Sequence, residues 1–126
     1  MGYDLEFIQA APAGGAKFPV QGEDAKALRK KADAFDAAQT RGALLGLPGS
    51  KEGPAKAVDF VGKGLNYARF EIKAKAIHVD NNCGAAELLR VYGQLKVTFP
   101  SLLIVDLQSG DVHDAASFQQ WWSRPL

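Results

Sequence analysis

The chain has 126 residues, of which 47% are hydrophobic, 10% aromatic and 23% charged, and its formal net charge at pH 7 is +1. This length and composition predict a single globular domain, residues 1–126, whose core can form without metals or disulfides. The balanced charge argues against nucleic-acid binding, which needs a basic face; the one basic run, residues 29–31, is typical of a solvated helix face.

Cysteine content and hydropathy exclude further classes. Cys83 is the single cysteine, which rules out an intramolecular disulfide and a zinc–thiolate cluster. Residues 1–10 lack the pattern of a secretory signal, and no apolar run approaches the ~18 residues of a membrane span. We therefore expect a cytoplasmic protein that does not enter a membrane.

The N-terminal third predicts a strand followed by a helix. Over residues 3–8, Tyr3, Leu5 and Phe7 alternate with acidic residues, which is the period of a half-buried strand. Residues 11–22 are rich in Pro and Gly and predict a loop. A helix is expected over residues 23–39, where apolar residues recur at helical spacing: Ala25, Leu28, Ala32 and Phe35.

The middle of the chain predicts a packed loop and a hairpin. Residues 40–65 hold many Gly and Pro but too many apolar residues for a flexible linker. We expect an ordered loop that packs on the domain, with a short strand at residues 58–61. Residues 66–72 and 76–80 alternate with opposite parity, so a turn must separate two strands of a hairpin.

The C-terminal part predicts a helix, a buried strand and a last helix. The first helix begins at Asn81 or Asn82 and has an apolar stripe of Ala85, Leu88, Leu89, Tyr92 and Leu95. Residues 102–107 are apolar almost without break, so Ile104 and Val105 should be buried on opposite faces of an inner strand. After a turn at residues 108–111, Asp114 is suited to be the N-cap of the last helix.

Together these elements predict an α+β fold. The order is β-α-ββ-α-β followed by a C-terminal helix, with a mainly antiparallel sheet of four to five strands. We expect a two-layer sandwich with the helices on one face, and the order also allows a ferredoxin-like arrangement.

Catalytic chemistry finds little support. A pocket could hold Asp106, which lies near a strand end, together with His113 and His78. Asp80 would share a strand face with His78, and His78 could form a Cys–His pair with Cys83. No H-x-x-x-H or H-x-H spacing and no phosphate-binding glycine motif occurs. We therefore expect no metal, no cofactor and no catalytic residue, and structural roles for Asp106 and Cys83.

The last helix carries the candidate partner-binding residues. Phe118 lies three and four positions before Trp121 and Trp122, so the three aromatic side chains share a helix face. They pack on the sheet or form an exposed anchor for a partner protein, since Trp is enriched at interface hot spots. Helical geometry predicts that Trp122 docks the helix while Trp121 reaches solvent.

Two motifs carry a resemblance. Residues 1–7 read MGYDLEF, and a helix at residues 86–95 leads into LLIVDLQSGDVHD at residues 102–114. These ends resemble a loose group of small bacterial α+β proteins that begin Tyr-Asp-Leu-x-Phe and carry a late Asp-Pro-Gln-x-Gly strand and turn. Leu107 stands where the pattern has proline, and the resemblance does not reach the middle of the chain. Most of the group are uncharacterised, and some look like immunity proteins paired with toxins.

The resemblance implies a bacterial protein that binds and blocks a toxin. We accordingly expect a non-enzymatic cytoplasmic protein-binding module, with a toxin-immunity protein as its specific form. The alternative is a small enzyme or ligand-binding domain with its pocket near Asp106, His113 and His78.

Overall fold

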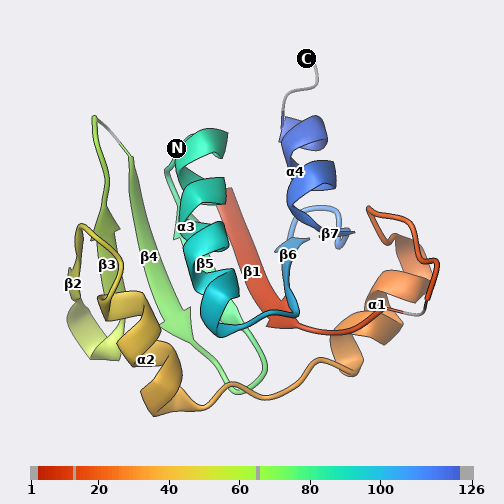
Figure 1. Cartoon of the computed structure of the whole chain (residues 1–126), viewed down its shortest axis with the longest axis horizontal. Helices are drawn as coiled ribbons and strands as arrows, with labels where there is room; N and C mark the ends of the chain where they lie inside the picture. Colours follow the sequence, from red (N-terminus) through yellow and green to blue (C-terminus); the bar gives the residue numbers. More distant parts are fainter. Residues whose placement is uncertain (1–2, 13, 65, 123–126) are drawn as a thin grey trace.

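The computed structural model describes residues 3–12, 14–64 and 66–122. Within these residues the chain forms one seven-stranded sheet in the order β2-β3-β4-β5-β1-β6-β7, and every neighbouring pair is antiparallel (Figure 1). The strands are β1 (Tyr3–Gln9), β2 (Ser50–Glu52), β3 (Val58–Val61), β4 (Tyr67–Ile72), β5 (Ile77–Asn81), β6 (Leu102–Asp106) and β7 (Val112–His113).

Four α-helices accompany the sheet in the described part of the chain. They are α1 (Gly22–Lys30), α2 (Ala37–Leu45), α3 (Ala85–Thr98) and α4 (Ala115–Trp122), and a short 3₁₀-helix, η1 (Pro54–Lys56), lies between β2 and β3. None of these helices has an apolar stretch long enough to cross a membrane. The α+β class and the antiparallel sheet are therefore confirmed.

The helices cover both faces of the sheet, and each face has its own core. Helices α2, α3 and α4 lie on one face, over a large cluster that includes Phe7, Phe70 and Ile104. Helix α1 lies on the other face, where Ala25 and Leu28 pack only against the β1–β6–β7 side of the sheet. The expectation of helices on a single face is wrong, because α1 packs against a separate apolar cluster on the second face of the sheet.

Strand β6 has apolar side chains on both faces of the sheet, so helices pack on both faces. Ile104 and Val105 are each 0% exposed; Ile104 belongs to the core under α3 and α4, whereas Val105 belongs to the core under α1. The predicted inner strand, buried on both faces, is thus confirmed. The sheet is larger than the expected four to five strands, and with α1 on the second face a ferredoxin-like arrangement is not confirmed.

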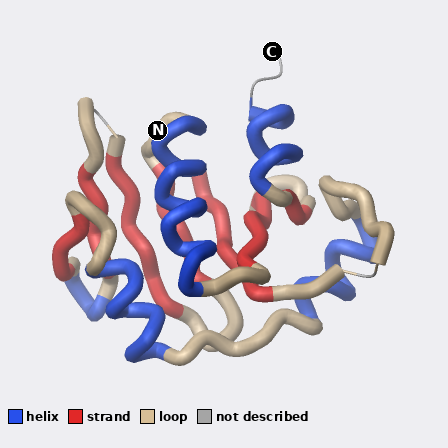
Figure 2. Tube along the Cα trace, viewed as in Figure 1, coloured by secondary structure: helices blue, strands red, loops and turns tan. Residues whose placement is uncertain are grey.

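The single helix expected over residues 23–39 is wrong. Helix α1 ends at Lys30, and the chain runs along one end of the sheet to α2 (Figure 2). On the way, Asp33 N donates to Gln9 O at 2.8 Å and Phe35 N donates to Ala74 O at 2.9 Å. These backbone hydrogen bonds replace helical ones. The segment that makes them leads from the core under α1 to the core under α2 and α3.

Residues 40–65 are ordered where the structure describes them, and they hold more regular structure than the sequence predicts. The second half of α2 lies here, followed by β2, η1 and the predicted short strand at Val58–Val61. The predicted hairpin forms as β4 and β5. Helix α3 begins at Ala85, later than expected, because Asn81 still pairs within the sheet and its side chain accepts a hydrogen bond from Cys83 N at 3.0 Å.

Candidate functional site

Asp106 is an anchor for the end of β6. It is 1% exposed, and its carboxylate accepts hydrogen bonds from the Tyr3 hydroxyl at 2.6 Å, from Gln108 N at 3.0 Å and from the Ser109 hydroxyl at 2.8 Å. Because three donors occupy the two oxygens, the carboxylate fixes the strand and the turn that follows it. This geometry matches the structural role predicted from the sequence.

His113 lies on the same face of the sheet as Asp106, and it too is buried. It is 1% exposed, its Nδ1 lies 3.0 Å from the Ser117 hydroxyl, and its ring packs against Phe118 and Trp121 with centroids 5.8 Å apart in both cases. Its Nε2 has no hydrogen-bond partner among the described residues. Burial lowers the pKa of this imidazole, against the opposing effect of nearby aspartates, and favours the neutral ring.

His78 and Asp80 lie on the opposite face from Asp106 and His113. Their neighbours Ile77 and Val79 point into the core under α3, and successive strand residues point to opposite faces. Asp106 lies opposite Leu5, and His113 lies opposite Ile104, both members of that same core. The sheet therefore separates His78 from Asp106 and His113, and it does not bring the three into one pocket.

Cys83 is also separated from His78. It belongs to the core under α3, 5% exposed, and burial followed by the nearby Glu87 carboxylate raises the pKa of its thiol to about 11. A thiol in such a site stays protonated near neutral pH and is a poor nucleophile. The described residues contain no group of three or more His, Cys, Asp or Glu side chains arranged to hold a metal ion.

The three aromatic residues of α4 pack inward together. Phe118 is fully buried, and both Trp121 and Trp122 are half-buried against the large core. The Tyr3 ring lies 5.5 Å from that of Trp121 and 5.8 Å from that of Trp122. The predicted contrast between a docked Trp122 and a solvent-exposed Trp121 is therefore absent, because Tyr3 projects from β1 against both indoles.

The open face of the sheet is the structure's principal unassigned surface. On the side opposite α2 and α3, the core under α1 includes no described residue of β3, β4 or β5. The outward side chains here alternate with core residues and form what we call the acidic face: Asp4, Glu6, Asp59, Arg69, Glu71, His78 and Asp80. Five carboxylates thus accompany one guanidinium and one imidazole, and the ammonium group of Lys51 on β2 lies opposite Asp59 at the edge of this face.

Cross-strand register organises the acidic face into two rows. One row runs from Asp59 through Arg69 and Asp80 to Asp4, and a second row joins Glu71, His78 and Glu6. Arg69 pairs with Asp59 through two hydrogen bonds of 2.7 and 3.0 Å, which hold the pKa of that carboxyl below its ordinary value. This pairing leaves Asp80 and Asp4 without a guanidinium of their own on this row.

His78 of β5 lies between the carboxylates of Asp4 on β1 and Glu71 on β4. Its Nε2 lies 3.9 Å from Asp4 Oδ1 and its Nδ1 lies 3.8 Å from Glu71 Oε1. A positive charge brought close to this surface would meet Asp4 and Asp80 together with Glu71, which shares an exposed ion pair of 3.5 Å with Lys73. Sequence reasoning missed the acidic face as a unit, although the charged residues alternating with apolar ones in residues 3–8, 67–72 and 76–80 were its signal.

No family model matches the chain, and comparisons with curated proteins and with solved structures give no significant match.

Proposed function

We propose that the protein is a non-enzymatic protein-binding module that binds a basic partner protein through the acidic face. The observation that carries this proposal is the half-uncovered sheet: three helices cover one face, while β3, β4 and β5 present charged side chains on the other. Electrostatic complementarity of this kind speeds association and selects the partner.

The specific form we propose is a bacterial toxin-immunity protein in the cytoplasm. The N-terminal YDLEF motif supports it, because it fits the Tyr-Asp-Leu-x-Phe start of the group that this chain resembles. The late DLQSG motif follows the group's Asp-Pro-Gln-x-Gly pattern except at Leu107. A preformed carboxylate surface on a rigid sheet would block a toxin whose own functional surface is basic. Such a role needs no catalytic residue, in keeping with a buried, protonated Cys83 and a triply hydrogen-bonded Asp106.

The proposal is tested with an acidic-face variant that carries Asp4→Asn, Glu71→Gln and Asp80→Asn. Its matched control carries Glu23→Gln, Asp24→Asn and Asp33→Asn, which remove the same charge from exposed positions outside the acidic face. Wild type and both variants are immobilised to capture the partner from extracts of the native organism, and affinities are then measured with the purified partner. We expect the acidic-face variant to bind about tenfold more weakly or worse, from the loss of three ion pairs, and the control to bind like wild type.

Two outcomes would contradict the proposal. Equal affinity of wild type and the acidic-face variant would show that another surface binds the partner; the half-buried Trp121 and Trp122 are the second candidate. The immunity role is tested separately by co-expression: the partner alone should arrest bacterial growth, and wild type but not the acidic-face variant should restore it. A partner that is harmless when expressed alone would exclude the immunity role.

A further inference from the structure

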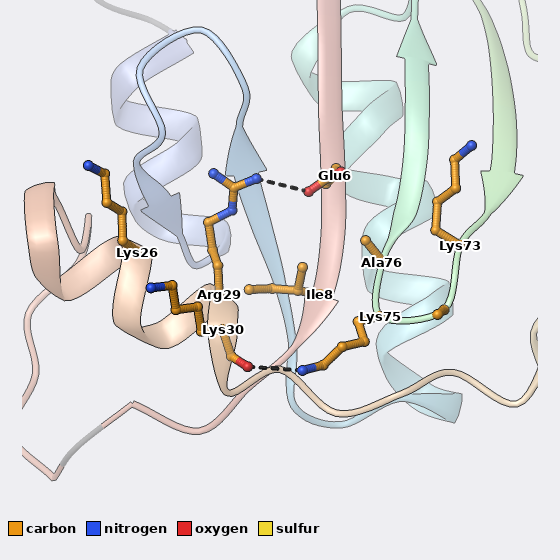
Figure 3. A pocket seen from close by; sticks show the side chains of 9 residues that line it. Glu6, Ile8, Lys26, Arg29, Lys30, Lys73, Lys75 and Ala76 are labelled. Carbon is orange, nitrogen blue, oxygen red and sulfur yellow. Dashed lines mark hydrogen bonds and ion pairs between the residues drawn. The ribbon is translucent and has the colours of Figure 1, made fainter.

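A basic groove lies beside the acidic face, between α1 and the turn that joins β4 to β5. Figure 3 shows Lys26, Arg29 and Lys30 on the α1 side and Lys73 and Lys75 on the turn side, with Ile8 of β1 between them. The groove has a volume of about 580 Å³ and includes a single carboxylate, that of Glu6. Its lining therefore carries five cationic side chains against one anionic side chain.

Two contacts span the groove and join its two sides. Arg29 Nη2 lies 3.3 Å from Glu6 Oε1, and Lys75 Nζ donates to the backbone carbonyl of Lys30 at 2.9 Å (Figure 3). Each contact ties α1 to the sheet or to its hairpin turn. The contacts engage Arg29 and Lys75, so the ammonium groups of Lys26, Lys30 and Lys73 are the ones available to a ligand. Lys26 and Lys73 make only exposed ion pairs, of 3.4 and 3.5 Å, with Glu23 and Glu71.

The chemistry of the groove favours a short acidic peptide. Its floor is apolar, formed by buried Ile8 and half-buried Ala76, and its lysines are exposed along both walls. An enclosed pocket would suit a small molecule, which normally buries most of its surface when bound. An open groove with an apolar floor and separated positive charges suits an extended segment with one apolar side chain flanked by carboxylates.

The surroundings of the groove argue against a longer polyanion. Asp4, Glu71 and Asp80 lie on the same side of the sheet, so a nucleic-acid backbone extending past Glu6 would meet a surface of like charge. Among the residues that the structure describes, no aromatic side chain lines the groove to stack against a base. A ligand a few residues long would remain within the basic part.

We propose that this basic groove binds a short acidic peptide segment of a partner protein. The site has the opposite charge to the acidic face, so it goes beyond the function proposed above. The two sites meet at Glu6 and at the Lys73–Glu71 ion pair, and the lysine substitutions that test the groove leave every carboxylate of the acidic face in place. The apolar residue of the segment contacts Ile8, and its carboxylates meet Lys30 on one wall and Lys73 on the other.

The test uses a fluorescein-labelled pentapeptide with a leucine between two glutamate pairs and, as a second probe, the same peptide with glutamines in place of glutamates. Fluorescence anisotropy at low ionic strength compares wild type with a groove variant, Lys30→Ala and Lys73→Ala. The control variant, Lys51→Ala and Lys63→Ala, removes the same charge from exposed positions outside the groove. We expect the groove variant to bind the acidic peptide about five- to tenfold more weakly and the control to lie within about twofold of wild type.

Added salt should weaken the acidic peptide's binding, and the glutamine peptide should bind poorly to all three proteins. Equal losses in both variants would overturn the proposal by showing general charge attraction, and so would the absence of binding to wild type. Inorganic triphosphate and a short single-stranded oligonucleotide are run as competitors. Displacement of the peptide by either one at a lower concentration than unlabelled peptide requires would assign the groove to phosphate ligands instead. Melting temperatures of both variants should match that of wild type, because neither removes a buried contact.

Discussion

Replacing Tyr3 with Phe should measure how strongly the buried Asp106 carboxylate holds the two ends of the domain together. The hydroxyl of Tyr3 lies 2.6 Å from Asp106 Oδ1, and the two residues are 103 positions apart in the chain. A hydrogen bond to a charged group contributes about 1.5–3 kcal/mol. Because Tyr3 is only half-buried and Asp106 keeps two other donors, we expect the lower part of that range, about 1.5–2 kcal/mol.

Urea denaturation followed by tryptophan fluorescence gives the free energies of unfolding for Tyr3→Phe, Asp106→Ala and the double variant. The coupling energy should exceed about 1 kcal/mol, since either single change already removes the shared bond. Ser109→Ala is a useful comparison: its hydroxyl binds the same carboxylate at 2.8 Å from an exposed position, so its loss should cost less. Additive effects of Tyr3→Phe and Asp106→Ala, within about 0.5 kcal/mol, would refute the reasoning.

Three further predictions concern buried groups. Ile104→Asp should abolish cooperative folding, because an unpaired buried carboxylate costs several kcal/mol. The control Val61→Asp, at a position that is 48% exposed, should melt like wild type. Normal melting of both variants would exclude the assignment of β6 as an inner strand. Stability should fall as the pH drops below about 6.5, where the unfolded chain protonates His113 and the folded chain, with its lowered pKa, does not. His113→Phe should reduce that loss in acid urea titrations, and an unchanged pH profile would contradict the assignment. Cys83, with a pKa near 11, should react with a disulfide reagent at pH 8 only after unfolding, and rapid native labelling would count against its burial.

The sequence carries enough information to predict elements whose side chains follow a regular period. Strands β1, β4 and β5 alternate apolar and polar residues, and β6 is apolar on both faces, so each could be located within a residue or two. The N-cap of α4 was predictable for a local reason: Asp114 Oδ1 accepts a hydrogen bond from Ser117 N at 2.8 Å. These features depend on neighbours in the sequence.

Features fixed by distant contacts could not be predicted in the same way. The spacing of Ala32 and Phe35 continues the helical pattern of α1, yet the two residues belong to cores on opposite faces of the sheet. The helix ends because the backbone between these two residues forms hydrogen bonds with Gln9 of β1, and this contact cannot be read from the local sequence. Strands β2 and β7 have three and two residues, too few for a period to be seen. The acidic face likewise depends on strand order, which brings Asp4 and Glu71 to either side of His78.

The two outermost strands have a consequence for solubility. The edge of a sheet can recruit another chain through its free backbone groups, and natural proteins protect such edges. Strand β2 is short and charged at Lys51 and Glu52, while β7 already exchanges two hydrogen bonds, of 2.8 and 2.9 Å, with Val20. These features disfavour the pairing of another strand with either edge of the sheet. Growth of the sheet by addition of a second chain is therefore disfavoured at both ends, even though much of one sheet face stays uncovered.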